Sequence, residues 1–238
     1  MDNATYAALT RQSGLLREMQ AVANNIANAS TTGYRSEGVI FSEYIDDLGP
    51  GAASLSMAAA RVRETLQSQG GLATTGGPFD LAIQGDGFFM VQTPAGQRLT
   101  RAGSFTPNEN GDLVTMEGFP VLDAGGAPVF VPQGAGPISI AADGTMSAEG
   151  VPIGQIGIVM PLDMAGMIRE DGVRFRADAG TEPALDGRML QGFLEESNVD
   201  PVLQVARMIE VQRAYELGQG FIDKEDERIR GVIKTLGR

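Results

Sequence analysis

Carboxylates are the main side chains of this sequence that could do chemistry. The 238 residues include no His and no Cys, so they lack the imidazole and thiolate groups that bind zinc, copper and iron–sulfur clusters or act as catalytic bases and nucleophiles. Pairs of carboxylates catalyse glycoside hydrolysis, and four lie near predicted strands and turns: Asp80, Asp86, Asp112 and Asp123. Nothing in their spacing selects two of them, and we expect no catalytic residue, no cofactor and no metal ion.

Two short motifs are similar to ligand-binding loops but are better explained as turns. Residues 108–112 (NENGD) place oxygen ligands at alternating positions, as the first half of a calcium loop does, but Phe119 stands where the twelfth position needs Glu. Residues 85–87 (GDG) are similar to part of a phosphate-binding loop, but no Lys and no helix start follow. We predict a hairpin turn for the first and a tight connection between strands for the second.

Charge and hydropathy narrow the classes of partner. The chain has 18 Lys and Arg against 30 Asp and Glu, a net charge of −12, and shows no basic patch, so we expect no nucleic acid partner. Its apolar stretches are far shorter than the roughly 20 residues that a membrane-spanning helix needs, so we expect no membrane insertion. The first residues lack a basic segment followed by an apolar one, so we expect no cleaved signal peptide.

The periodicity of apolar residues predicts a helix over residues 3–29. Steps of three and four residues place them on one stripe: Leu9, Leu15, Leu16, Met19, Val22, Ala23 and Ile26. Gln12 interrupts the stripe. Short polar side chains follow over residues 28–33, and we expect Gly33 to permit a left-handed end to the helix.

A second, longer helix is predicted from Pro201 to Leu236. Asp200 followed by Pro201 is a favourable helix start, because Asp caps the helix and Pro suits its first position. Apolar residues recur at seven-residue intervals, the d positions of a heptad: Met208, Tyr215, Ile222, Ile229 and Leu236. The pattern fits either a surface helix packed on a globular core or a coiled-coil-like pairing of the two ends of the chain.

The composition changes between the two helices. Residues 36–78 are rich in Gly, Ala and Ser and predict an extended connector. Residues 79–195 combine short apolar runs with closely spaced turn signals, which is typical of an all-β sandwich or barrel-like domain. The predicted fold class is α+β: paired long helices, from residues 1–35 and 196–238, bracket the connector and the β-rich domain.

Three stretches of the sequence resemble one known family. Residues 23–35 read ANNIANASTTGYR, residues 80–89 read DLAIQGDGFF and are followed by TRAGSF, and residues 191–202 read QGFLEESNVDPV and continue to MIEVQRAYE. Their order resembles that of the axial proteins of the bacterial flagellum, especially the rod proteins of its basal body. The chain is most similar to the proximal-rod members, with the distal-rod members as the alternative.

The resemblance implies a structural role. It implies that both terminal helices line a tube with the β domain outside, that copies of the chain assemble with neighbouring rod proteins, and that the flagellar export apparatus delivers the unfolded chain to the periplasmic rod, which transmits torque for motility. A β-domain protein that binds or cleaves glycans and carries helical tails is the alternative from another class.

The resemblance also suggests which residues form the assembly interface. Asn24, Asn25 and Asn28 would form interhelical hydrogen bonds that fix register; the alternative is that they end the helix in solvent. The expected interface residues are Leu16, Met19, Ala23, Asn24, Asn25, Ile26, Asn28, Gly33, Asn198, Met208, Tyr215, Ile222, Ile229 and Leu236.

Overall fold

The protein is an α+β protein made of two compact units. A computed structural model describes residues 3–46, 55–184 and 186–236. The helical unit comprises Met1–Ala29, Ser36–Leu66 and Val199–Arg238, and the β unit comprises Ser30–Arg35 and Gln67–Asn198. Each unit is therefore built from segments that are distant in the sequence.

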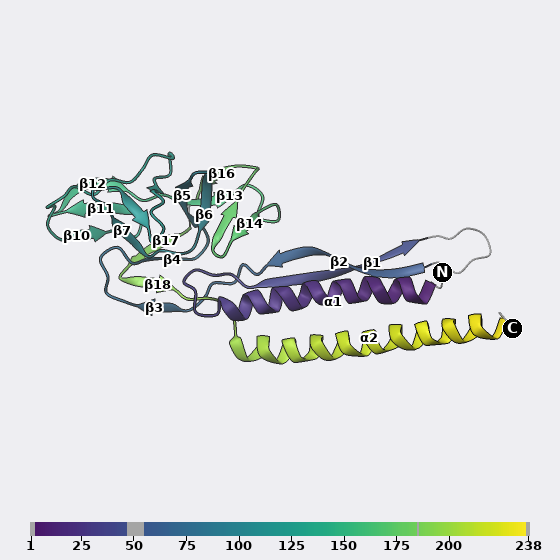
Figure 1. Cartoon of the computed structure of the whole chain (residues 1–238). Coiled ribbons are helices and arrows are strands. Elements are labelled where there is room, and N and C mark those ends of the chain that lie inside the picture. The colour runs from purple at the N-terminus through teal and green to yellow at the C-terminus, as the bar shows by residue number, and fades with distance from the viewer. Residues whose placement is uncertain (1–2, 47–54, 185, 237–238) are drawn as a thin grey trace. The chain divides into compact units, whose positions relative to one another are not determined.

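Two helices and a β-hairpin form the helical unit (Figure 1). Its elements are α1 (Asn3–Ala27), β1 (Glu37–Asp46), β2 (Leu55–Thr65) and α2 (Pro201–Leu236). The hairpin packs along α1, and α2 runs beside α1 as well. The start of α2 is the predicted one, because the carboxylate of Asp200 accepts the N–H groups of Val202 at 2.9 Å and Leu203 at 3.1 Å.

The end of α1 differs from the prediction. The helix ends at Ala27, and the N–H of Asn28 donates to the carbonyl of Asn24 at 3.1 Å. Gly33 does adopt a left-handed conformation, with φ of 69°, but it lies six residues further on. A Cβ at Gly33 would come within 2.3 Å of the backbone nitrogen of Ala102. Glycine is needed there for a close approach inside the β unit, not for ending the helix.

About half of the expected connector forms the two strands of a hairpin. Strands β1 and β2 pair antiparallel from Glu37 opposite Thr65 to Asp46 opposite Leu55, with one irregularity between Ile40 and Phe41. The hairpin was not predicted because β2 is rich in Ala, which is uncommon in strands. The Gly- and Ala-rich stretch 49–54 lies outside the described residues.

Short antiparallel strands form the β unit (Figure 1). The strands are β3 (Leu72–Thr74), β4 (Leu81–Gln84), β5 (Phe88–Thr93), β6 (Gly96–Thr100), β7 (Phe105–Pro107), β8 (Leu113–Thr115), β9 (Val121–Leu122), β10 (Ile138–Ile140), β11 (Thr145–Ala148), β12 (Val151–Gln155), β13 (Ile158–Pro161), β14 (Ile168–Asp171), β15 (Arg174–Arg176), β16 (Thr181–Pro183), β17 (Arg188–Gln191) and β18 (Phe193–Glu195). The largest sheet has the order β14-β15-β6-β5-β13-β16, with β9 also paired to β5.

Strand β5 lies at the centre of the β unit and is buried on both faces. Phe89 and Val91 belong to one apolar cluster, whereas Phe88 and Met90 belong to a second cluster on the other face. Successive side chains of a strand point to opposite faces, so a strand covered on both sides needs a continuous apolar run. Residues 88–91 are one of the short apolar runs from which the β-rich domain was predicted, and all four are buried.

Both short motifs are turns, as predicted. The side-chain oxygen of Asn108 accepts the N–H groups of Asn110 and Asp112, each at 2.9 Å, and closes the connection between β7 and β8. Residues 85–87 join β4 to β5, and two of them are glycines with positive φ, Gly85 and Gly87.

Candidate assembly interface

Buried polar side chains set the register between the two helices. Gln12 of α1 donates to the carbonyl of Tyr215 at 2.9 Å, and the Arg207 guanidinium donates to the Glu18 carboxylate at 2.7 Å. Near the other end of α1, Asn25 donates to the side chain of Gln204 at 3.2 Å. Rising numbers in α1 meet falling numbers in α2, so the helices are antiparallel.

These polar contacts are costly to break, since a buried polar group that loses its partner keeps its desolvation penalty. Gln12, Glu18 and Asn25 are all buried. The hydrogen bond to Glu18 raises the pKa of the Arg207 guanidinium above its ordinary value. A shift of register between the two helices would break all three contacts at once. These polar residues therefore fix the register, as a buried polar residue does in a coiled coil.

Asn25 also joins the hairpin to α1. Its amide donates to the carbonyl of Glu37 at 2.8 Å, and its oxygen accepts the N–H of Glu37 at 2.8 Å. The expected role of Asn25 in interhelical bonding therefore agrees with its geometry within one chain. Asn24 is exposed, and the half-buried Asn28 donates its amide back to the carbonyl of Asn24 at 2.9 Å.

The apolar stripe expected on α1 is divided between two faces. Leu15 and Val22 are buried, and Met19 and Ile26 are half-buried. Leu9, Leu16 and Ala23 instead form an exposed row with seven-residue spacing. The buried face takes Gln12, Glu18 and Asn25 in their place, which hydropathy alone does not predict.

The d positions of α2 lie on the side that faces α1. Met208, Tyr215 and Ile222 are half-buried beside the fully buried Val211. Ile229 is 38% exposed. The side chain of Leu236, another expected interface residue, lies outside those that the structure describes.

The end of α2 extends beyond α1. Phe221 lies at the level of Ala7, so in an antiparallel pair the last ten or so residues of α2 pass the level of Asn3, the first described residue of α1. Their apolar side chains are exposed: Ile229, Val232 and Ile233. No described segment of this chain covers them.

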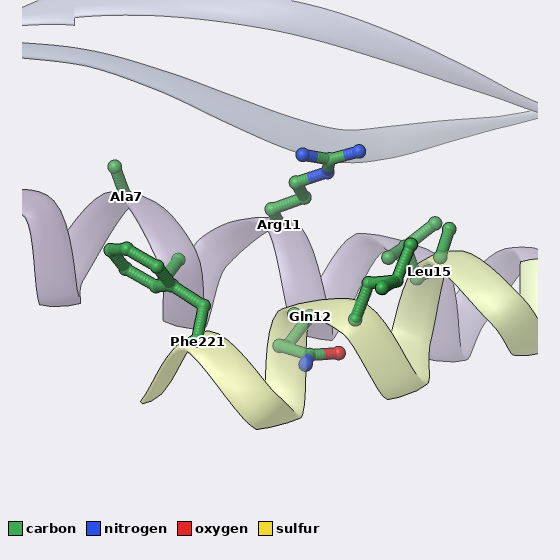
Figure 2. A pocket seen from close by; sticks show the side chains of 9 residues that line it. Ala7, Arg11, Gln12, Leu15 and Phe221 are labelled. Carbon is green, nitrogen blue, oxygen red and sulfur yellow. The ribbon is translucent and has the colours of Figure 1, made fainter. Parts of the chain in front are cut away.

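A hollow of about 500 Å³ opens between α1 and α2 (Figure 2). We call it the notch; it is lined by Ala7, Ala8, Arg11, Gln12, Leu15, Ala214, Leu217, Gly218 and Phe221. Small residues leave the space open, and a Cβ at Gly218 would come within 2.7 Å of the Gln12 amide. Leu217 and Phe221 form an apolar wall.

A buried charge cluster lies in the β unit. The Glu195 carboxylate is 2.9 Å from the Arg35 guanidinium and 3.6 Å from that of Arg101. Arg35 also donates to the carbonyls of Gln67 and Ser68. Arg101 donates to the carbonyl of Gly85 at 2.6 Å. All three charged residues are at most 3% exposed.

Two guanidinium groups share one carboxylate in this charge cluster. Burial lowers the pKa of Arg101 to about 10, and the charge of Glu195 opposes this shift. Burial likewise lowers the pKa of Arg35. A buried cation needs a carboxylate and carbonyl oxygens around it, and the segments that supply them are held together as a result.

Two expected interface residues, Gly33 and Asn198, lie around the charge cluster in the β unit. The N–H of Gly33 donates to the carbonyl of Glu195 at 2.7 Å, and that of Asn198 to the carbonyl of Tyr34 at 3.2 Å. Asn198 also donates its amide to Ser68 at 2.8 Å. Sequence analysis missed the cluster, although Arg35, Arg101 and Glu195 each belong to a different one of the three family-like stretches. The presence of one charged residue in each of these three stretches could have indicated the cluster.

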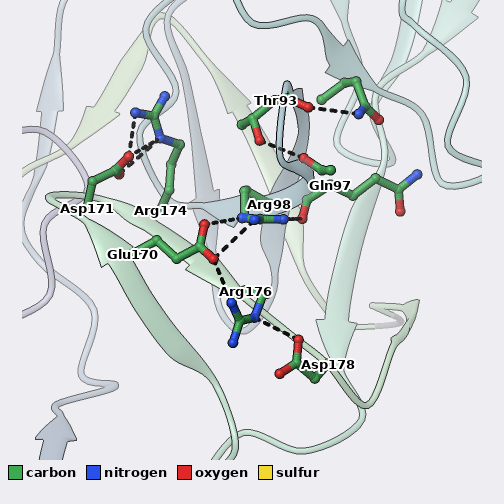
Figure 3. A network of polar contacts seen from close by, with 10 residues as sticks. Thr93, Gln97, Arg98, Glu170, Asp171, Arg174, Arg176 and Asp178 are labelled. Atoms are coloured by element: carbon green, nitrogen blue, oxygen red, sulfur yellow. Dashed lines mark hydrogen bonds and ion pairs between the residues drawn. The ribbon is translucent and has the colours of Figure 1, made fainter.

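Further arginines order the surface of the large sheet. Arg98 donates twice to Glu170, Arg176 donates to Glu170 at 2.9 Å, and Arg176 also pairs with Asp178 (Figure 3). The hydrogen bond from Arg98 is the main reason that the pKa of Glu170 lies below its ordinary value. These four side chains form a continuous chain of ion pairs that joins β6, β14 and β15 to Asp178.

The four carboxylates considered for catalysis hold turns or lie between strands. The Asp123 carboxylate accepts the N–H groups of Gly125 and Ala127, and the Asp112 carboxylate accepts the side-chain amide of Asn108 at 3.3 Å in the β7–β8 turn. The backbone of Asp80 forms a β-bridge with Ser104. Asp86 lies between β4 and β5. Among the described residues no cluster of carboxylates has the make-up of a metal site, and neither described helix is apolar enough along its length to cross a membrane.

Three family models match this chain in order along its length. One described as "Flagella basal body rod protein" matches residues 6–35. One described as "Flagellar hook protein FlgE/F/G D1 domain" matches residues 82–148. One described as "Flagellar basal body rod FlgEFG protein C-terminal" matches residues 190–234.

Curated relatives match over nearly their whole length. The flagellar basal-body rod protein FlgF of Caulobacter vibrioides is 39% identical over 247 residues, with 100% of this chain and 99% of the relative covered. The protein of the same name from Mesorhizobium japonicum is 40% identical, with the same coverage. The flagellar basal-body rod protein FlgG of Bacillus subtilis is 30% identical, with 98% of each chain covered.

Proposed function

Because this chain belongs to the family of flagellar basal-body rod proteins, we propose that it is a structural subunit of the proximal rod. In this role it assembles through its helical unit into a helical tube that transmits torque and is needed for motility. The proximal rod is favoured over the distal rod because three relatives named FlgF are 37 to 40% identical to the chain and two more are 33% identical, against 30 to 31% for relatives named FlgG.

The observation that carries the proposal is the exposed apolar surface of the helical unit. Leu9 is 51% exposed on α1, and Leu217 is 77% and Ile233 64% exposed on α2. Scattered exposed apolar residues are ordinary, but rows of them along helices are typical of protein interfaces. Neighbouring subunits would bury these rows.

The shape of such contacts favours a filament. The exposed row on α1 and the extension of α2 are different surfaces, so a contact between them is heterologous and need not close into a ring. Coiled-coil-like packing between helices of neighbouring copies would extend the antiparallel α1–α2 pair. The expected interface residues on α1 and α2 serve partly within one chain, as Asn25 does, and partly between chains.

The remaining features of the proposal concern location and partners. The subunit lies in the periplasmic part of the basal body, contacts copies of itself and neighbouring rod proteins, and arrives through the flagellar export apparatus. It has no catalytic activity. The use of the Asp112 and Asp123 carboxylates as hydrogen-bond acceptors in turns supports this last point.

A substitution in the extension of α2 tests the proposal. In a strain that lacks its own copy of the protein, Ile229→Asp should abolish swimming and remove the protein from isolated basal bodies, because it places a charge in an interface between subunits. Ile168→Asp is the matched control, since Ile168 is similarly exposed, at 45% against 38%, but lies on β14. Normal swimming and incorporation of Ile229→Asp would contradict assembly through α2.

A further inference from the structure

We propose that the charge cluster of Arg35, Arg101 and Glu195 is a mechanical clasp, which keeps the β unit closed while a load pulls on the chain segments that leave it. The inference rests on the proposed function, because a rod that transmits torque loads each of its subunits. Apolar side chains of the same volume would stabilise a core as well as buried ion pairs do. The position of the cluster in the β unit gives the charges a separate task.

The chain enters and leaves the β unit at the charge cluster. It crosses between the two compact units at four places, and the residues of the β unit at three of them are Arg35, Gln67 and Asn198. The Arg35 guanidinium donates to the carbonyl of Gln67 at 2.8 Å and is 2.9 Å from the carboxylate of Glu195. The fourth residue, Ser30, shortly precedes Arg35. A load that travels along the chain therefore reaches the β unit at or near this cluster.

Beyond the cluster, the two ends of the β unit run side by side in opposite directions. Strand β3 pairs antiparallel with β18, with Leu72 opposite Glu195, and β4 pairs antiparallel with β17 further from both ends. A pull on Gln67 and Asn198 opens such pairs from the end, because it loads their hydrogen bonds one after another and not together. The pairing alone therefore resists a pull weakly.

The cluster fastens this open end from three segments of the chain. Asn198 donates its N–H to the carbonyl of Tyr34 at 3.2 Å and its side-chain amide to the carbonyl of Ser68 at 2.8 Å. Arg35 joins the carboxylate of Glu195 to the carbonyl of Ser68 as well. The three segments that carry these residues must separate together, so their bonds share the load.

The cluster is itself anchored to the large sheet. Arg101, which directly follows β6, lies 3.6 Å from the Glu195 carboxylate and donates to the carbonyl of Gly85 at 2.6 Å. Arg169 of β14 donates to the backbone carbonyl of Arg35 at 2.5 Å. Strands β6 and β14 both belong to the large sheet, so a load on the cluster passes into the body of the β unit.

Single-molecule pulling on the whole chain tests the clasp. The chain has no Cys of its own, so cysteine handles can be added at its two ends, and the load then reaches the β unit through the cluster. Under this load Glu195→Gln should speed unfolding of the β unit about a hundredfold, because the cluster is already broken in the transition state and forced unfolding follows the unfolding rate. Glu196→Gln, the same change at an exposed neighbour, should leave the rate unchanged.

A second direction of pulling separates the clasp from ordinary stability. Handles at Val151→Cys and Leu162→Cys, which replace residues that are 64% and 59% exposed, load the β unit away from the cluster. The cluster then stays intact in the transition state, so Glu195→Gln should keep the unfolding rate within about threefold of that of the unsubstituted protein.

A core substitution should show the opposite pattern. Met146 is fully buried on β11, so Met146→Ala also destabilises the β unit, but it lies outside the charge cluster. It should speed unfolding at least about tenfold under load at residues 151 and 162, and it should leave the rate unchanged under load at the ends of the chain.

A milder variant keeps the test decisive if Glu195→Gln does not fold. Asn198→Ala removes the side-chain hydrogen bond to Ser68 and should speed unfolding about fivefold under load at the ends of the chain only.

The outcomes separate this inference from the proposed function. Equal acceleration of Glu195→Gln or Asn198→Ala under both loads would overturn the inference, because the cluster would then contribute stability alone. Unchanged rates under load at the ends of the chain would also overturn it, and the rod assignment would stand. Failure of the proposed function shows instead as absence of the unsubstituted chain from isolated basal bodies, which the pulling measurements do not involve.

Discussion

The Glu195 carboxylate balances two buried cations. Its partners are Arg35 and Arg101. Any two of these three residues are separated by about 65 residues or more along the chain. With the carboxylate removed, two guanidinium groups would remain buried with carbonyl oxygens as their main partners. The cluster therefore makes the β unit depend on a single side chain.

Neutralising Glu195 should destabilise the β unit. We expect Glu195→Gln to lower its free energy of unfolding by about 3–5 kcal/mol, the usual cost of leaving a buried charge without its partner. Chemical denaturation of the purified protein measures this change. Glu196→Gln is the control, because Glu196 is exposed and surface changes are usually within about 0.5 kcal/mol. Equal stability of the two variants would mean that carbonyl groups alone satisfy the arginines.

Single residues were the hardest features to predict from the sequence. Hydropathy placed Leu9 and Leu16 with Leu15 on one stripe, but the structure separates them because Gln12, Glu18 and Asn25 occupy the buried face. A polar residue on a helix can be buried only when a specific partner is present. Those partners, such as Tyr215 for Gln12, lie about 200 residues away, and no local pattern reports them.

At the scale of elements, the edge of the large sheet is protected by ion pairs. Strand β14 is an edge strand, and an uncovered edge can pair with another chain. A row of ion pairs joins Glu170 of β14 to Arg176 of β15 and to Arg98 of β6 (Figure 3). This row orders the edge and makes it acid-sensitive.

The acid sensitivity can be predicted with its sign. The pKa of Glu170 lies below its ordinary value of 4.5 in the folded protein. Such a carboxyl stabilises the folded state above its unfolded pKa, and the stabilisation is lost as the pH falls through the lower, folded pKa. We therefore expect the melting temperature of the native protein to fall more than that of Glu170→Gln between about pH 6 and pH 3.

A second surface carboxylate serves as the control for this experiment. Glu182, exposed on β16, has the same side chain in the same sheet. Glu182→Gln should keep the acid response of the native protein. If Glu170→Gln and Glu182→Gln respond alike, the ion pairs of Arg98 contribute nothing specific.

Elements with strong local signals were predicted well. The Asp200–Pro201 start of α2 is where the sequence placed it, and β5 lies in the region predicted to be rich in strands, because capping and burial on both faces leave a local pattern. The β1–β2 hairpin was missed, since its second strand is rich in Ala and both strands pack against α1. Tertiary contacts with α1 stabilise this hairpin, and a local sequence pattern does not report them.

At the scale of the whole molecule, two compact units predict two unfolding transitions. We expect calorimetry to resolve them, with the helical unit melting first because much of the apolar surface of α2 is exposed. Leu15→Ala should lower only the first transition and Ile83→Ala only the second, since each removes a buried side chain from one unit. Such changes cost about 2–5 kcal/mol. One shared transition that both substitutions lower would mean that the units unfold together.

The discontinuous helical unit also has a consequence for the order of folding. Contacts such as Gln12 with Tyr215 span 203 residues, so α1 can pack against the nearby hairpin but lacks its partner helix until nearly the whole chain is free to fold, and contacts of such separation form slowly. During that interval an α2 from another molecule can take the place of its own. A newly arrived subunit can therefore exchange helices with a neighbour before it closes, and the growing end of an assembly would act as a template for its folding.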